Sequence, residues 1–344
     1  FLPSRAAENL FWVGRYTERA EATARLLRTI LKNYSEGELF SDEVEAACLR
    51  QLLYSLTYMT ETYPGFIGKG SPAKLANPKE ELLSLLLAGD RIGSVVSNLN
   101  GMARAAYAVR DLWSTDTWRV IDNMNTSWSA FRHDPQVNLY QLRNELNHLI
   151  TTLMAFSGLS MESMTHESGW LLLDMGRRLE RGLLSIAFIR STLGHRQEEA
   201  VRHLVLESVL TTTDNVITYR RRYRSYLQTQ TVLDLLLLDE RNPRSLAYQI
   251  NTLQSHLTQL PRQRNPYRLS EEERLILDAS TRLRLSDTVA LTQAPDDSTI
   301  LPALDDFMNQ LSGLLSQMSQ VVTERYFSHA QAPHQSIAIY PEAS

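Results

Sequence analysis

Apolar residues recur at helical spacing, three or four positions apart, along most of the chain. This spacing predicts amphipathic α-helices, because residues at i, i+3, i+4 and i+7 share one helix face. No segment shows the alternation of apolar and polar residues that would indicate strands joined by hairpin turns. The sequence therefore predicts an all-α fold, a large helical bundle. Its helices are expected at about 4–34, 42–62, 80–88, 91–112, 115–130, 136–157, 165–193, 197–226, 231–238, 243–260, 270–283 and 299–327.

Residues that break or cap helices mark several boundaries between these segments. Residues 63–78 form the only long stretch rich in proline and glycine, and they are interpreted as a surface loop, with a lid or a partner contact as the alternative. Gly158 and Gly194 are expected to end the helices that precede them. The pattern Ser270-x-x-Glu273 is a capping box and predicts a helix start at Ser270.

One short pattern, Gly-Arg-x-x-Glu-Arg, occurs twice. Gly14, Arg15, Glu18 and Arg19 in the first copy match Gly176, Arg177, Glu180 and Arg181 in the second. The copies indicate an internal pseudo-repeat in which residues of about 1–157 and 158–344 are two related halves of one domain, 1–344. We expect the two helices to pack on each other at their glycines, since a glycine inside a helix allows another backbone to approach closely.

The second copy lies among apolar residues on nearly every side of its helix. A helix of this kind is typically buried, so Asp174, Arg177, Glu180 and Arg181 are expected inside the protein, where charges must be paired. Such pairs could bind a ligand, or they could only determine which helices pack together. Both interpretations remain open from the sequence.

Composition narrows the possible functions. The chain has 344 residues and a net charge of −4, so its bulk charge favours neither nucleic acid nor a membrane surface as partner. No apolar run reaches the roughly 20 residues needed to cross a bilayer, and no signal peptide is recognisable. The single cysteine, Cys48, excludes internal disulfides and favours a reducing compartment, so we expect a cytoplasmic protein. Because the chain begins at Phe1 without methionine, we expect it to be part of a longer protein.

Known catalytic and metal-binding motifs are absent from the sequence, and no metal site is predicted. Glu145-x-x-His148 has the spacing used in di-iron bundles, but a second such motif would be required. Arginines outside the repeat remain candidates for binding an anion: Arg104 lies in a segment with two tryptophans, and Arg244 lies at an expected helix N-terminus. A solvated helix face for Arg104, and simple helix capping near Arg244, explain these two positions equally well.

Five segments together resemble the bacterial alpha-E family, a helical domain named for its Glu-Arg motif. They are SRAAENLFWVGRYTERAEATARLL (4–27), VRDLWSTDTWRVI (109–121), GLSMESMTHESGWLLLDMGRRLERG (158–182), TTTDNVITYRRRY (211–223) and LLLLDERNPRSLAYQ (235–249). The resemblance implies a domain that works beside, or fused behind, a circularly permuted ATP-grasp protein, and near transglutaminase-like proteases. ATP-grasp enzymes form amide bonds through acyl phosphates, so ATP and Mg are implied for that partner and no cofactor is implied for this chain. The family's Glu-Arg pair falls on Glu18 and Arg19.

Three functions remain possible at this point. The first is an accessory domain that holds an anionic amino acid, peptide or phosphate group for an amide-forming ligase. Its site would contain Arg15, Glu18, Arg19, Arg177, Glu180, Arg181, Arg104 and Arg244. The second is an all-α enzyme that uses Glu18 or Glu180 as acid or base. The third is a structural interaction module whose ion pairs only specify helix packing.

Overall fold

The structure is a computed structural model that describes residues 2–34, 42–261, 265 and 267–327. Within these ranges the regular elements are α-helices, one 3-10 turn and one π-helical turn, so the predicted all-α fold is confirmed. A single β-type bridge, between His195 and Ile300, joins two loops of the described chain. None of the described helices is long and apolar enough to cross a membrane.

The order of elements follows the expected helices closely. The first part of the chain contains α1 (Ser4–Asn33), α2 (Glu43–Thr60), α3 (Ser71–Ala76), α4 (Lys79–Leu87), α5 (Val95–Ala108), η1 (Arg110–Leu112), α6 (Thr115–Arg132) and α7 (Leu139–Ser163). The second part contains α8 (Ser168–Thr192), α9 (Glu199–Thr212), α10 (Val216–Tyr223), α11 (Thr229–Leu233), η2 (Asp234–Leu238), α12 (Leu246–Gln259), α13 (Glu271–Leu285), α14 (Thr288–Leu291) and α15 (Pro302–Tyr326).

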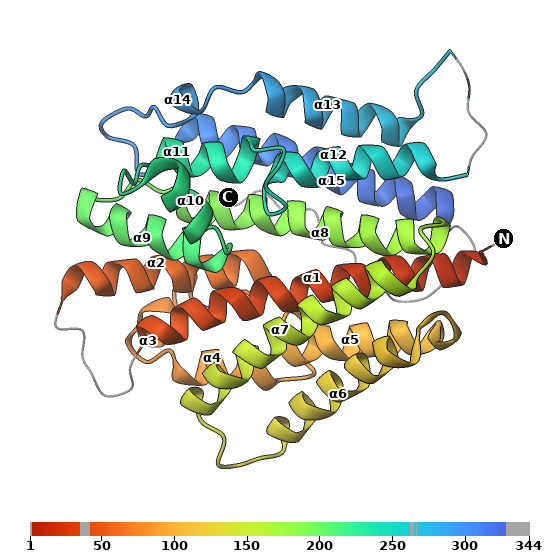
Figure 1. Ribbon diagram of the computed structural model, residues 1–344. Coiled ribbons are helices and arrows are strands. Elements are labelled where there is room, and N and C mark those ends of the chain that lie inside the picture. The colour runs from red at the N-terminus through yellow and green to blue at the C-terminus, as the bar shows by residue number, and fades with distance from the viewer. Residues whose placement is uncertain (1, 35–41, 262–264, 266, 328–344) are drawn as a thin grey trace.

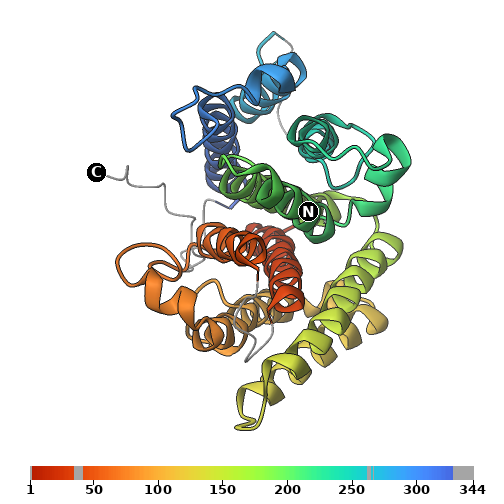
Figure 2. The same cartoon turned by 90° about the vertical axis from the view of Figure 1, so that its left-hand side faces the viewer.

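Helices α1 and α8 lie side by side at the centre of the bundle, and the other long helices surround them (Figures 1 and 2). Helix α1 also packs on α2, α5 and α7, whereas α8 also packs on α2, α12 and α15. Because neighbours cover both central helices, each of them buries charged residues together with apolar ones. The charges of the two repeated patterns are therefore buried or half-buried in the fold, as the sequence predicts for the second copy.

Several predicted boundaries differ from the structure. Gly158 lies inside α7, which continues to Ser163, because a single glycine is tolerated inside a helix at modest cost. The predicted boundary between the two halves therefore falls within a helix, and the pseudo-repeat of whole halves stays a prediction. The predicted helix 197–226 is divided because Asp214 adopts a positive φ of 57° between α9 and α10. Residues 328–344 of the predicted second half lie outside the described residues.

Other local predictions agree with the structure. The capping box at Ser270 is present, with the Ser270 side chain accepting from the Glu273 backbone N–H and the Glu273 side chain accepting from that of Ser270. Most of the predicted surface loop 63–78 is exposed or half-buried, including its one short helix, α3, but Gly65, Phe66 and Pro78 are buried.

Candidate functional site

At the two glycines of the repeated pattern, the backbones of α1 and α8 approach each other closely. A Cβ added to Gly14 would lie 2.1 Å from the backbone oxygen of Leu173, and one added to Gly176 would lie 2.1 Å from that of Phe11. Leu173 and Phe11 are each three residues before the glycine of their own helix. The contact is therefore reciprocal, and it confirms the predicted packing of these two helices at their glycines.

The same reciprocity governs the charged residues next to the glycines. On one side, which we call the Glu180 group, Arg15 and Arg19 of α1 both donate to Glu180 of α8. The Arg15 Nε–Glu180 Oε2 distance is 2.5 Å, and the Arg19 Nε–Glu180 Oε1 distance is 2.8 Å. Arg15 also donates through Nη1 to the Ser319 hydroxyl on α15, at 2.8 Å.

On the other side, which we call the Glu18 group, Arg177 and Arg181 of α8 face Glu18 of α1. Arg181 donates through Nε and Nη2 to the two carboxylate oxygens of Glu18, at 2.9 and 2.7 Å, which is a bidentate pair. The Arg177 Nε lies 3.5 Å from Glu18 Oε1, which is an ion pair without hydrogen-bond geometry. Each glutamate is thus bracketed by the two arginines of the opposite helix.

Further charged residues extend the Glu18 group toward the start of α12. Glu21 on α1 pairs with Arg25 at 2.9 Å and with Arg244 at 2.8 Å, and Arg181 lies 3.7 Å from its other oxygen. Arg244 precedes the N-cap residue of α12, Ser245. The structure therefore brings Arg244 into the site, as the sequence suggested.

Asp174 organises the charges at the start of the second copy. Its carboxylate accepts from Arg177 at 3.2 Å and from Arg178 at 3.1 Å. His256 of α12 lies 2.7 Å away through Nε2, while its buried Nδ1 has no hydrogen-bond partner among the described residues. Burial works against the charge on Asp174, but His256 and the arginines outweigh it and hold the pKa of this carboxyl below its usual range.

Two glutamates of the site, Glu180 and Glu21, are held as carboxylates. Burial opposes the charge on Glu180, whose side chain is 1% exposed, but Arg15 and Arg19 outweigh burial and lower its pKa. The pKa of Glu21 is lowered in the same way: burial opposes its charge, and Arg244, Arg181 and Arg25 favour it. A carboxylate whose pKa is lowered and whose oxygens are both engaged is a weak proton acceptor. This arrangement favours charge pairing at Glu180 over a role as general base.

Burial disfavours the charge on five arginines of the site, but the net shift of the pKa differs among them. Burial lowers the pKa of Arg15, Arg177 and Arg244. In Arg181 burial also disfavours the charge, but Glu18 and Glu21 outweigh it and raise the pKa. The pKa of Arg19 is raised as well, because Glu180 outweighs the effect of burial there. Arginine stays protonated in all these settings, so the positive charges of the site persist.

We call the combined set the Arg/Glu cluster, and it contains more arginines than carboxylates. Its members are Arg15, Arg19, Arg25, Arg177, Arg178, Arg181 and Arg244 with Glu18, Glu21, Asp174 and Glu180. Seven arginines against four carboxylates leave an excess of three positive charges. Glu61, beyond the end of α2, adds a longer-range attraction for Arg19. Within the described residues, Arg19 Nη2 is buried and has no hydrogen-bond acceptor.

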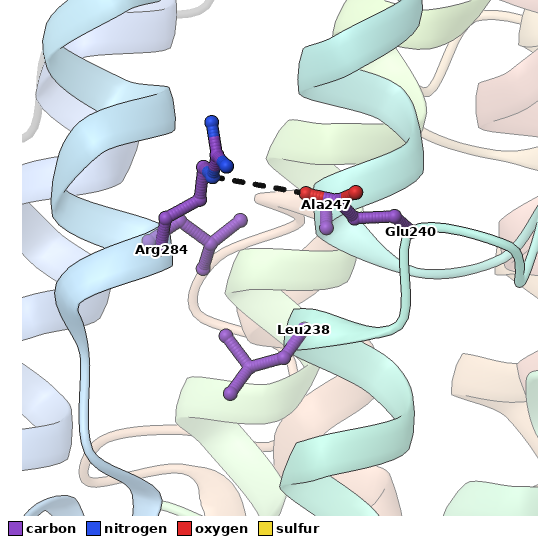
Figure 3. Close-up of a pocket in the computed structure, with 5 residues that line it drawn as sticks. Leu238, Glu240, Ala247 and Arg284 are labelled. Carbon is purple, nitrogen blue, oxygen red and sulfur yellow. Dashed lines mark ion pairs between the residues drawn. The ribbon is translucent and has the colours of Figure 1, made fainter.

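Arg104 is the one predicted site residue that the structure does not bring into the Arg/Glu cluster. It is exposed on α5 and lines a different hollow, between α5 and α6. The sequence suggested Arg104 because of the charges and tryptophans around it, but its position on α5 directs it away from the α1–α8 contact. A second hollow lies between the loop before α12 and the end of α13, where Arg284 faces Glu240 at 3.9 Å (Figure 3).

The sequence did not identify several members of the cluster. Glu21 and Arg25 could have been found as an i, i+4 pair on the first helix. Arg178 is adjacent in sequence to Arg177 and shares Asp174 with it. His256 and Ser319 come from α12 and α15, and no local pattern places them near the repeat. Across the described chain, no group of three or more His, Cys, Asp or Glu residues is arranged to hold a metal ion.

Comparison with known proteins agrees with these features. The profile of the Alpha-E family, a predicted alpha-helical domain with a conserved ER motif, matches residues 2–327. The chain is 33% identical over 327 residues to the uncharacterized proteins Rv2567 of Mycobacterium tuberculosis (strain H37Rv) and Mb2597 of Mycobacterium bovis. These alignments cover 93% of this chain but 36% of each relative, so the chain spans about a third of their length. No solved structure matches it. The helical fold, the two Glu-Arg motifs at its centre and the match over residues 2–327 show that the chain belongs to the Alpha-E family.

Proposed function

We propose that this domain is an accessory, substrate-holding part of an ATP-dependent system that forms amide or peptide bonds. The Arg/Glu cluster would bind the anionic group of an amino acid, a peptide or a phosphorylated intermediate. The ligase chemistry, with its ATP and Mg, would belong to a circularly permuted ATP-grasp partner. A transglutaminase-like protease would be a further partner of the same system.

The excess of arginine in the Arg/Glu cluster carries this proposal. Burying positive charge without a counter-charge is costly, so an excess of three positive charges at the centre of a bundle favours an additional anion. Carboxylates and phosphates fit best, because the planar guanidinium presents parallel donors to two oxygens. The relatives support a partner domain indirectly, because they have about two-thirds of their length outside the aligned region.

Arg19 is the most suitable arginine to meet such an anion. Its Nε is engaged by Glu180, its Nη2 has no acceptor among the described residues, and its side chain is 14% exposed. Arg15, by comparison, is 4% exposed and already donates to both Glu180 and Ser319. An anion that reached Arg19 would complete the hydrogen bonding of Nη2 and offset part of the excess charge.

The decisive experiment replaces Arg19 with lysine, which retains the charge but lacks the parallel N–H donors of the guanidinium. Binding of inorganic phosphate and of L-glutamate to the purified chain would be measured by calorimetry. ATP-dependent amide formation would be measured with the ATP-grasp partner present. The Arg19→Lys variant should bind these anions about tenfold or more weakly, since a hydrogen bond to a charged group contributes about 1.5–3 kcal/mol. Arg282→Lys, on the exposed Arg282–Asp278 pair of α13, is the matched control and should bind as the wild type does.

A purely structural module is the second candidate, and the reciprocal pairing supports it. Each of Glu18 and Glu180 already faces two arginines from the opposite helix, which is sufficient to fix how α1 and α8 pack. In this case Arg19→Lys would lower the melting temperature slightly and leave partner-dependent activity unchanged in the folded protein. That outcome, or the absence of any anion binding by the wild type, would reject the substrate-holding function.

A further inference from the structure

The hollow between α5 and α6 has the composition of a small-molecule site. Its volume is about 360 Å³, near the lower end of the range of about 300–1,000 Å³ for ligand pockets. Six of its lining residues combine two aromatic rings, one aliphatic side chain, one cation, one carboxylate and one amide: Tyr107, Trp118, Ile121, Arg104, Asp122 and Asn125. Of these, Ile121 is buried and forms an apolar floor.

Two aromatic rings line the end of the hollow nearest the connection between α5 and α6. The ring centroids of Tyr107 and Trp118 are 6.1 Å apart, with the ring planes tilted by 49°. The guanidinium carbon of Arg110, in the turn after α5, lies 4.8 Å from the centre of the Tyr107 ring. These contacts fix the side of the hollow nearest the connection between the two helices, which lie side by side in the lower half of Figure 1.

Helix geometry places the charged residues opposite each other beyond this aromatic end. Arg104 is three residues before Tyr107 on α5, which is about 4.5 Å along the helix axis. Asp122 is four residues after Trp118 on α6, which is about 6 Å along that axis. Since a short turn joins the two helices and both steps lead away from it, Arg104 and Asp122 lie at a similar level on the two walls.

These two charges are not paired with each other or with another side chain. In the described part of the chain, neither Arg104 nor Asp122 makes an ion pair or a side-chain hydrogen bond. The two charges of the other hollow, Arg284 and Glu240, differ in this respect, because they form an ion pair at 3.9 Å (Figure 3). A cation and a carboxylate on opposite walls, both free, match a ligand that carries one charge of each sign.

We propose that the α5–α6 hollow binds a free α-amino acid with an apolar or aromatic side chain. Its carboxylate would contact Arg104, its ammonium would contact Asp122 and the amide oxygen of Asn125, and its side chain would lie over Ile121 against Tyr107 and Trp118. The guanidinium fork suits the carboxylate, and aromatic faces stabilise both an apolar group and a nearby ammonium. This site is separate from the Arg/Glu cluster and does not depend on the function proposed for it.

The test is calorimetric titration of the wild-type chain with L-phenylalanine, N-acetyl-L-phenylalanine and L-phenylalanine amide. The free amino acid should bind, and blocking either charged group should weaken binding about tenfold or more, because each block removes one charge-assisted contact. Arg104→Ala should weaken binding of the free amino acid and leave binding of the amide almost unchanged. Asp122→Asn should weaken binding of the free amino acid and leave binding of the N-acetylated ligand almost unchanged.

Arg284→Ala is the matched control, since it removes another exposed arginine beside a hollow and should not alter binding. The tested side chains are exposed, so the variants should have the same melting temperature as the wild type. No binding at millimolar concentration would overturn the proposal. Equal binding of the blocked ligands, or unchanged binding in both Arg104→Ala and Asp122→Asn, would overturn it as well. None of these results would bear on the Arg/Glu cluster, which is tested with other ligands and at Arg19.

Discussion

The Glu180 group and the Glu18 group each combine two arginines of one helix with one glutamate of the other, yet their surroundings differ. Two residues before the glycine, α1 has Trp12, whereas α8 has Asp174. The guanidinium carbons of Arg15 and Arg19 lie 4.8 and 5.3 Å from the centre of the Trp12 ring. Arg177, the counterpart of Arg15, instead lies 3.2 Å from the carboxylate of Asp174.

This difference changes how the arginine donors are satisfied. An aromatic face attracts the positive charge of a guanidinium, but it does not occupy the N–H groups that point outward in its plane. A carboxylate both neutralises the charge and accepts from those groups. The Glu18 group has Glu21 and Asp174 as additional carboxylates, whereas the Glu180 group has aromatic rings and Ser319. Each group keeps one buried donor without a hydrogen-bond partner among the described residues, Arg19 Nη2 in the Glu180 group and Arg177 Nε in the Glu18 group. Arg177 Nε still lies 3.5 Å from a carboxylate oxygen of Glu18.

Deleting the two glutamates should give the largest and most unequal effects. Glu180→Ala leaves Arg15 and Arg19 without their shared carboxylate in a buried site, and should lower the free energy of unfolding by about 3–5 kcal/mol. Glu18→Ala should cost less, because Arg181 still has Glu21 at 3.7 Å and Arg177 still has Asp174. Urea unfolding of both variants measures the difference. Equal losses would show that the outer carboxylates do not support the Glu18 group.

The glycine contact should be next in size. Gly176→Ala places a Cβ about 2.1 Å from the Phe11 oxygen, which forces α1 and α8 apart at a cost of about 1–3 kcal/mol or more. Gly313→Ala on α15 is the control, because no atom lies within 4 Å of the added Cβ there. This control should instead raise stability by about 0.5–1 kcal/mol, since alanine is the better helix former. A neutral Gly176→Ala would mean that the two central helices can separate freely.

Acid should weaken the carboxylate contacts of both groups. Asp174 and Glu180 have folded-state pKa values below their ordinary values of 3.8 and 4.5. Their stabilisation is therefore fully present above about pH 4.5 and is lost as the pH falls through the lowered values. Asp174→Asn should be less stable than the wild type at neutral pH, and the gap should narrow in acid. Asp278→Asn, on an exposed pair, should show almost no gap at any pH; a constant gap for Asp174→Asn would contradict the linkage.

Sequence patterns could predict the contact but not the difference between its two sides. The repeated glycines and the apolar surroundings of the second copy were sufficient to place α1 against α8 and to bury Glu180. The roles of Trp12 and Asp174 depend on which residues lie across the helix interface, and His256, Ser319 and Arg244 reach the site through tertiary packing. For Arg104 the sequence was misleading. The nearby charges and tryptophans suggested a site residue, but they did not indicate on which face of its helix Arg104 lies.

The smallest effect is expected from Arg19→Lys, and its comparison with Arg181→Lys separates the two groups. Arg181 donates to both oxygens of Glu18, and lysine cannot reproduce that bidentate pair, so Arg181→Lys should cost about 1.5–3 kcal/mol. Arg19 donates to one oxygen of Glu180 and leaves Nη2 unused, so a lysine ammonium can replace its single contact. Arg19→Lys should therefore cost only about 0.5–1 kcal/mol. Thermal and urea unfolding of both variants would decide this, with Arg282→Lys as the exposed reference. If Arg19→Lys is as destabilising as Arg181→Lys, the free donor of Arg19 is already satisfied within the folded chain, and the Glu180 group has no arginine left to offer an anion.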